Sequence, residues 1–304
     1  MASDPDLIAC LYPFGEYAER SLEAIELPDN AARYTDAVLP LPKGLCNSRE
    51  TSEEPDDDGD GDGDDNKDAP SHDYRPKLQL RFGQNRKYRA GFTIGTSSRC
   101  DIRLPTFSDV KGLSSIQCAI SFDSEGRLVL RDLRDPKRRG DGTAVTYDSQ
   151  GGEKRRGFTW ILGGHRALDN TEIVILFHNK IQFLIVVPYR DFHSVDHKKR
   201  IDQFRLGANA SVSDLVLSEL SFFGDGDTTE VPTGAQTPRT NAILLQVGPE
   251  KLGQGTFGTV THVWDVSTGR EFARKDPVEE EYRPEDWARE INLMSTLNHV
   301  CFST

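Results

Sequence analysis

Short segments in which apolar and polar residues alternate dominate residues 74–190, and they constrain the fold more than any other feature. The clearest sets are Leu78, Leu80 and Phe82; Ile116, Cys118, Ile120 and Phe122; Ile173, Ile175 and Phe177; and Ile181, Phe183, Ile185 and Val187. Further strand-like runs cover residues 92–94, 128–130, 144–147 and 158–161. A period of two, repeated at short spacing, is typical of antiparallel sheets. We therefore predict a mainly β fold, with an antiparallel β-sandwich over residues 74–190.

The flanking segments have a different composition. Residues 1–73 mix scattered apolar groups with Pro and Asp, and residues 53–65 alone carry nine acidic side chains and no base. The rest of the chain then has a net charge of only −3, so overall charge argues neither for nor against nucleic acid as a partner. We predict a disordered acidic tether over 1–73, with at most a short helix near 21–27, and a helix (193–206) followed by a linker over 191–242.

Several classes of protein are disfavoured. No apolar run approaches the roughly 18 residues of a membrane-spanning helix, and the first residues lack the basic and apolar regions of a secretion signal. The five cysteines form no C-x-x-C pair and the seven histidines show no metal-binding spacing. We expect an intracellular protein, nuclear or cytoplasmic, with unpaired thiols and no metal site, acting away from membranes.

A glycine-rich motif opens the last part of the chain. Its residues are Leu252, Gly253, Gln254, Gly255, Thr256, Phe257, Gly258, Thr259 and Val260. Glycines allow the backbone to approach phosphate oxygens closely. A dinucleotide-binding loop would open a helix, whereas a strand, a turn at 267–270 and a second strand ending at Lys275 follow here. A helix is expected over 284–297, with Trp287, Ile291, Met294 and Leu297 on one face.

This order of motifs resembles the N-lobe of eukaryotic Ser/Thr protein kinases, over residues 243–304. The resemblance implies that the glycine-rich loop and Lys275 hold the phosphates of ATP with Mg²⁺, and that Glu290 pairs with Lys275. No H-R-D, D-F-G or A-P-E motif occurs in the sequence, so we expect no catalytic residue and no phosphoryl transfer from this chain. It reads either as a fragment of a complete kinase or as a short product, and three strands with one helix should fold poorly alone.

A second group of motifs lies within the predicted sandwich. Phe92-Thr93-Ile94-Gly95 is followed by Cys100-Asp101-Ile102, Ser114-Ser115-Ile116-Gln117, Arg131-Asp132-Leu133 and Asp141-Gly142-Thr143. This order resembles forkhead-associated (FHA) domains, which bind phosphothreonine through loops at one end of the sandwich. FHA and kinase modules together resemble the checkpoint-kinase class.

The sequence departs from the FHA pattern at three positions. Thr96 stands in place of an arginine, Gln117 in place of a scaffolding histidine and Asp141 in place of an asparagine. Threonine cannot provide a forked cationic donor, so we hypothesise that Arg138 or Arg139 supplies the missing cation. The expected phosphopeptide-binding residues are Thr96, Ser114, Arg138, Arg139, Asp141 and Thr143.

Three functions remain open from the sequence. The first is recognition of phosphorylated proteins by a module joined to the ATP-binding start of a Ser/Thr kinase, acting in phosphorylation signalling. The second is an active kinase in a full-length form, of which this chain is a fragment. The third is a protein-interaction module that does not read phosphate.

Overall fold

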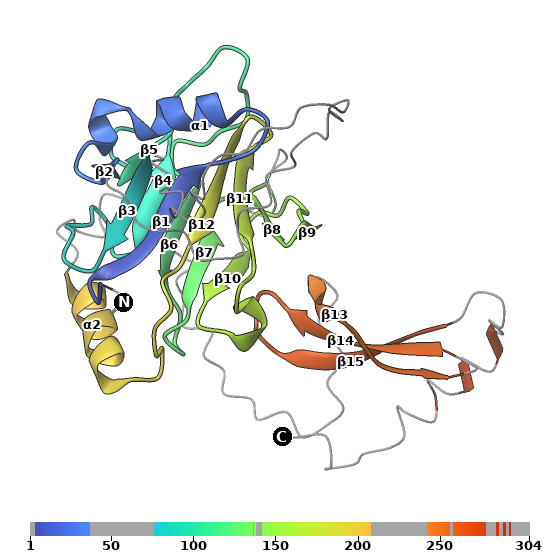
Figure 1. Ribbon diagram of the computed structural model, residues 1–304. Helices are drawn as coiled ribbons and strands as arrows, with labels where there is room; N and C mark the ends of the chain where they lie inside the picture. Colours follow the sequence, from blue (N-terminus) through green and yellow to red (C-terminus); the bar gives the residue numbers. More distant parts are fainter. Residues whose placement is uncertain are drawn as a thin grey trace, which may run out of the picture.

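Two β-sheets stack face to face in the computed structural model, and a third sheet lies against one end of this pair (Figure 1). The structure describes residues 4–36, 76–135, 137, 142–207, 242–255, 258–277, 284, 285, 288, 289 and 292. The predicted mainly β architecture is confirmed.

The larger sheet has seven strands in the order β2-β3-β1-β12-β11-β8-β9. In chain order they are β1 (Leu7–Pro13), β2 (Tyr34–Thr35), β3 (Lys77–Arg81), β8 (Ala144–Tyr147), β9 (Gln150–Gly151), β11 (Ile173–His178) and β12 (Ile181–Val186). All of its pairings are antiparallel.

The second sheet has five strands in the order β10-β7-β6-β4-β5. They are β4 (Phe92–Gly95), β5 (Ile102–Arg103), β6 (Cys118–Phe122), β7 (Leu128–Asp132) and β10 (Thr159–Gly163). Only β4 and β5 pair in parallel within the described chain. One apolar core joins the two sheets, with Phe92, Ile120 and Trp160 from this sheet packed with Leu80 and Phe183 from the other. The alternating runs of the sequence thus lie where they were predicted, each with one face in this core.

The N-terminal segment corrects the prediction of a disordered tether over 1–73. β1 is a buried interior strand of the seven-stranded sheet, paired with both β3 and β12. It is apolar on both faces: Ile8 and Leu11 enter the main core, while Cys10 and Tyr12 join a cluster on the opposite face. A strand buried on both faces shows no alternation, which explains why the period-two pattern missed it.

The elements that follow β1 also belong to the folded part. They are α1 (Ala18–Ile25) and the 3₁₀ turn η1 (Pro28–Asn30). The buried Asn30 side chain donates to the carbonyls of Ala24 (2.7 Å) and Arg103 (2.9 Å), and accepts from the Arg103 amide (2.8 Å). These bonds fix the segment to β5. The acidic run at 53–65 lies outside the described residues.

Helix α2 (Val195–Leu206) confirms the helix predicted at 193–206, but it packs on the sandwich instead of belonging to a linker. Ser194 caps its first turn by accepting from the amide of His197 (3.2 Å). His197, Ile201 and Phe204 are buried against the five-stranded sheet. The folded unit therefore extends to about residue 207, and the linker predicted beyond it lies outside the described residues.

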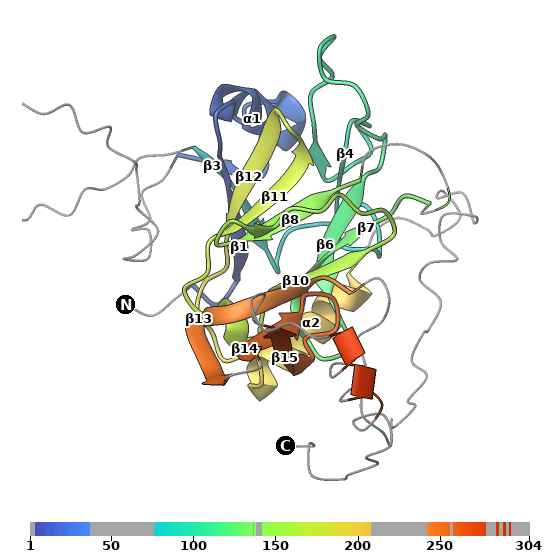
Figure 2. The ribbon, with the colours of Figure 1, turned by 90° about the vertical axis from the view of Figure 1, so that its right-hand side faces the viewer.

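The third sheet contains β13 (Leu244–Gly255), β14 (Gly258–Asp265) and β15 (Glu271–Pro277), all antiparallel. The predicted strand, turn and strand after the glycine-rich motif are therefore present. Residues 284, 285, 288, 289 and 292 are helical, within the predicted 284–297 helix. The apolar face predicted for that helix lies outside the described residues. Figure 2 shows the sheet beside β10, at the end of the sandwich that also carries α2.

Candidate functional site

Two loops that the FHA-like motifs place apart in the sequence meet at one end of the sandwich. The amide of Thr96, just after β4, donates to the carbonyl of Ser114 (3.0 Å), and the Thr96 hydroxyl is 3.3 Å from the same oxygen. The amide of Ser97 donates to the carbonyl of Ser115 (3.0 Å). Thr96 and Ser114 are both half-buried, so two of the predicted site residues form one partly accessible surface.

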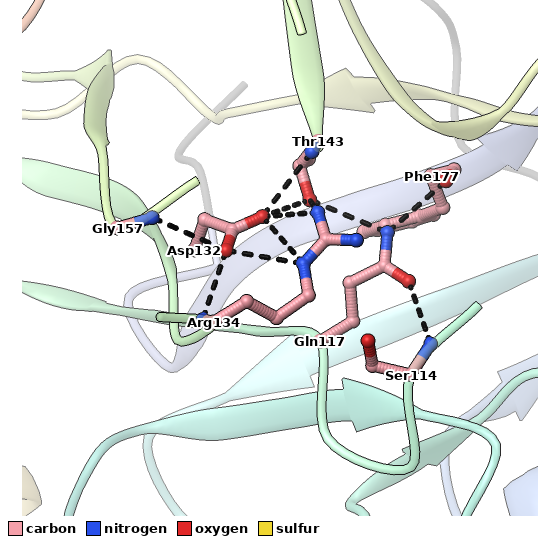
Figure 3. A network of polar contacts seen from close by, with 7 residues as sticks. All are labelled: Ser114, Gln117, Asp132, Arg134, Thr143, Gly157 and Phe177. Carbon is pink, nitrogen blue, oxygen red and sulfur yellow. Dashed lines mark hydrogen bonds and ion pairs between the residues drawn. The ribbon is translucent and has the colours of Figure 1, made fainter. Parts of the chain in front are cut away.

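Gln117 occupies the scaffolding position beneath this surface (Figure 3). It is fully buried; its Oε1 accepts from the Ser114 amide (3.3 Å), and its Nε2 donates to the Phe177 carbonyl (3.0 Å) and to Thr143 Oγ1 (3.3 Å). The glutamine thus connects the Ser114 loop, just before β6, to the seven-stranded sheet.

Thr143 lies below the surface, and this differs from its predicted role as a contact for phosphate. Its side chain is completely buried, and its hydroxyl donates to Asp132 Oδ2 (2.7 Å) while accepting from Arg134 Nη2 (3.0 Å). A hydroxyl whose hydrogen bonds are filled within the protein cannot reach a ligand. Thr143 therefore supports the loops and does not bind directly.

Asp132 and Arg134 form the centre of this support, and sequence reasoning missed the arginine. Arg134 Nε lies 3.2 Å and 3.1 Å from the two carboxylate oxygens of Asp132, and its Nη2 also pairs with Asp132. The carboxylate further accepts from the amides of Thr143 (3.2 Å) and Gly157 (3.4 Å) (Figure 3). The only sequence signal was an arginine two residues after the Asp of the D-L motif. Because Asp132 neutralises it, Arg134 does not replace the arginine absent at position 96.

The remaining predicted residues, Arg138, Arg139 and Asp141, lie outside the described residues. One exposed cation of the described chain lies on the loop that begins at Thr96. The Cys100 amide donates to the Ser97 carbonyl (3.0 Å) and the Arg99 amide to Ser97 Oγ (3.2 Å), which closes a turn around Arg99. The Arg99 side chain is exposed. It is a second candidate for the missing cation.

The glycine-rich motif forms the hairpin between β13 and β14. Gly255 pairs with Gly258, Gly253 with Val260, and Val260 in turn with Lys275 on β15. A Cβ added at Gly258 would lie 3.3 Å from Cε of Lys275, whereas one added at Gly253 or Gly255 would meet no atom within 4 Å. The lysine stem thus runs beside the hairpin end, and the other two glycines face open space.

Three of the residues expected to bind ATP, Thr256, Phe257 and Glu290, lie outside the described residues. Leu252 and Gln254 lie on the exposed part of β13. The structure brings together Gly253, Gly255, Gly258, Val260 and Lys275. This set fits a phosphate group, because it combines an open backbone with one cationic side chain.

Other kinds of site find no support in the described part of the chain. It contains no group of three His, Cys, Asp or Glu side chains that could hold a metal ion. None of its helices is long and apolar enough to cross a membrane. Cys10, Cys100 and Cys118 are buried and carry free thiols.

Comparisons with known proteins give little further information. No protein-family model matches the chain, and no curated protein matches it. Among solved structures, the chain is similar to the crystal structure of Rad53 1–466 in complex with AMP-PNP. The identity is 21% and the TM-score 0.31, over 68% of this chain and 40% of that one. A TM-score this low carries no argument about fold or function.

Proposed function

We propose that the sandwich binds a phosphothreonine segment of a partner protein at the surface formed by Thr96 and Ser114. The observation that carries this proposal is the juxtaposition of the two loops over a buried polar frame, made of Gln117, Thr143, Asp132 and Arg134. A rigid frame reduces the entropy lost when the loops bind a ligand. Phosphate recognition would use charge-assisted hydrogen bonds from hydroxyl, amide and guanidinium donors.

The hydroxyl of Ser114 is the central donor of this proposal, and its removal gives the first test. We expect Ser114→Ala to weaken binding of a phosphothreonine peptide roughly 10- to 150-fold, because a hydrogen bond to a charged group contributes roughly 1.5–3 kcal/mol. The measurement is isothermal titration with a phosphothreonine peptide library and its dephosphorylated counterpart. Ser115→Ala, which removes an exposed neighbouring hydroxyl, is the matched control.

The outcome also separates the alternatives. Equal affinity for the phosphorylated and dephosphorylated peptides would contradict the proposal and favour an interaction module that does not read phosphate. The cation is identified by comparing Arg99→Met with the double variant Arg138→Met/Arg139→Met. The larger loss of phosphopeptide affinity marks the side chain that contacts phosphate.

We propose as a second function that the third sheet binds ATP with Mg²⁺. The placement of Lys275 beside Gly258 supports it. Lys275 would hold the α and β phosphates, and the open backbone at Gly253 and Gly255 would admit them. Magnesium would neutralise phosphate charge. The proposal is restricted to binding; an active Ser/Thr kinase would also need the catalytic groups of a longer chain.

Lys275→Met tests the nucleotide site. We expect at least a tenfold loss of MgATP affinity, because the variant keeps the apolar stem and removes the charge that faces phosphate. Lys251→Met is the control, since Lys251 is an exposed lysine of the same sheet. Its Nζ lies 3.3 Å from Gln254 Oε1. Equal MgATP affinity in the two variants would exclude Lys275 from the site.

A further inference from the structure

The turn between β14 and β15, residues 266–270, is held by the sandwich through its backbone. The Ile161 amide of β10 donates to the Val266 carbonyl (2.9 Å), and Arg127 Nη1 donates to the Thr268 carbonyl (2.9 Å). His165 Nε2 lies 2.8 Å from the Gly269 carbonyl. Three carbonyls of one turn therefore meet three donors of the sandwich. We call residues 266–270 the docking turn.

The sandwich closes tightly around Gly269 of the docking turn. Its φ is +74°, and an added Cβ would lie 2.4 Å from Arg127 Nη1, 3.1 Å from His165 Cδ2 and 3.2 Å from Ile161 Cδ1. Arg127 cannot simply move aside, because it also pairs with Asp123 (2.7 Å). A side chain at position 269 would break the contacts of the docking turn as well as strain its backbone.

The shape of the docking turn is set within its own sheet. The buried carboxylate of Asp265 accepts from the amide (2.9 Å) and hydroxyl (2.8 Å) of Ser267 and from the hydroxyl of Thr268 (2.9 Å). The carbonyls are thus preorganised for the donors of the sandwich.

Aromatic and charged contacts extend the interface on both sides of the docking turn. Trp264 is 2% exposed; it stacks on His165 at 4.8 Å and meets the edge of Tyr147 at 5.6 Å. The carboxylate of Glu271 pairs with Arg166 and lies 2.7 Å from His262 Nε2. Its pKa is lowered to about 2, chiefly by the hydrogen bonds from Arg166. The interface has the buried aromatic centre and polar rim typical of specific contacts.

The phosphate-binding end of the sheet lies away from this interface. Lys275 is four residues beyond Glu271 on β15, or about 13 Å at the usual rise of a strand. Figure 1 shows the hairpin projecting away from the sandwich at that end. Arg127 lies in the turn between β6 and β7, whereas Gln117 and Asp132 lie at the opposite ends of those strands. The docked sheet thus leaves the Thr96–Ser114 surface uncovered.

We propose that the docking turn is the anchor through which the sandwich keeps the three-stranded sheet folded. Arg127 and His165, remote from the glycine-rich hairpin, thereby control nucleotide binding by that hairpin. A three-stranded sheet has little core of its own, and much of its buried surface, including Leu245, Trp264 and Val266, belongs to the common core. The part of this inference that concerns nucleotide rests on the second proposed function.

The test is hydrogen exchange of the full chain by mass spectrometry, with matched glycine variants. We expect Gly269→Val to speed amide exchange in 258–277 at least tenfold while exchange in β6 and β7 stays unchanged. Gly248→Val is the control, because Gly248 has a similar φ of +67° on the same sheet but no atom within 4 Å of an added Cβ. Equal exchange in the two variants would overturn the anchor.

A substitution in the sandwich separates loss of the docking contacts from local misfolding caused by a side chain at position 269. Arg127→Met should also speed exchange in 258–277, whereas Arg81→Met, whose guanidinium pairs with Asp4 elsewhere on the sandwich, should not. MgATP affinity is then measured for all four variants. If Gly269→Val and Arg127→Met speed exchange but leave MgATP affinity unchanged, the docking turn does not control nucleotide binding by the hairpin. Absence of MgATP binding by the unmodified chain would refute the nucleotide function alone, since the exchange result does not depend on nucleotide.

Discussion

An Asp132→Ala variant should lower the free energy of unfolding by about 3–5 kcal/mol, because it breaks a buried ion pair by removing the carboxylate that contacts Arg134. Arg134 is 7% exposed and Asp132 2%. The variant also removes the acceptor of the Gly157 amide and of the Thr143 hydroxyl, and one of the two acceptors of the Thr143 amide, which also donates to the Arg155 carbonyl. Urea denaturation followed by circular dichroism gives the measurement.

Two further variants make this result specific. Asp202→Ala removes an exposed partner 3.6 Å from Arg205 on α2 and should change stability by less than about 0.5 kcal/mol. The double variant Asp132→Leu/Arg134→Met removes both buried charges and should be more stable than Asp132→Ala, since apolar pairs often replace buried ion pairs without loss. A double variant no more stable than Asp132→Ala would show that the charge of Arg134, buried without the Asp132 carboxylate, is not the cause.

Stability should also fall as the pH drops from about 6.5 to about 4, because α2 buries His197 in its neutral form. Burial lowers the pKa of His197 to about 4, and the neighbouring Arg190 and, more weakly, Arg200 add to this effect, which Asp191 and a backbone hydrogen bond at Gly126 oppose. The imidazole packs edge-on against Phe82, Phe122 and Phe192. In the unfolded chain the His197 imidazole has its ordinary pKa.

The sign of the effect follows from this difference in proton binding. Above pH 6.5 both states hold a neutral imidazole, so the full stability is present. Between 6.5 and 4 only the unfolded state gains the proton, and the folded state loses up to about 3 kcal/mol relative to it. Denaturation midpoints between pH 4 and 8 should therefore decline in the unmodified chain and change less in His197→Leu. Parallel declines in the two proteins would assign the effect to other groups.

The sandwich was predictable from sequence wherever a strand has one buried and one less buried face. β3, β6, β11 and β12 show this alternation and were all predicted. β1 was missed because both of its faces are apolar, and α2 was predicted as a helix but not as part of the core. The contacts of α2 with Phe82 and Phe122 join residues far apart in the chain, so no local sequence pattern could predict them.

The candidate sites were also predictable only in part from the sequence. Motif spacing predicted that Thr96 lies near Ser114 and Lys275 near the glycine-rich hairpin, and both contacts are present; the binding roles of these residues stay predictions. It misplaced Thr143, because an N-G-T-like motif does not reveal that the hydroxyl points inward to Asp132. It also missed Arg134 and the docking turn. Both depend on partners in other strands, and a lone arginine or a Ser-Thr-Gly turn looks like ordinary surface chemistry until the fold is known.

The interior position of β1 has a consequence for the order of folding during synthesis. This strand is made before the other strands of the sandwich, yet one of its two neighbours, β12, is among the last parts of the sandwich to be made. The pairing of Leu11 with Ile185 must close a loop that contains nearly the whole module. Until then the edge of β1 that β12 will cover stays open to wrong partners. The nascent chain should accordingly fold late and depend on chaperones that bind extended apolar segments.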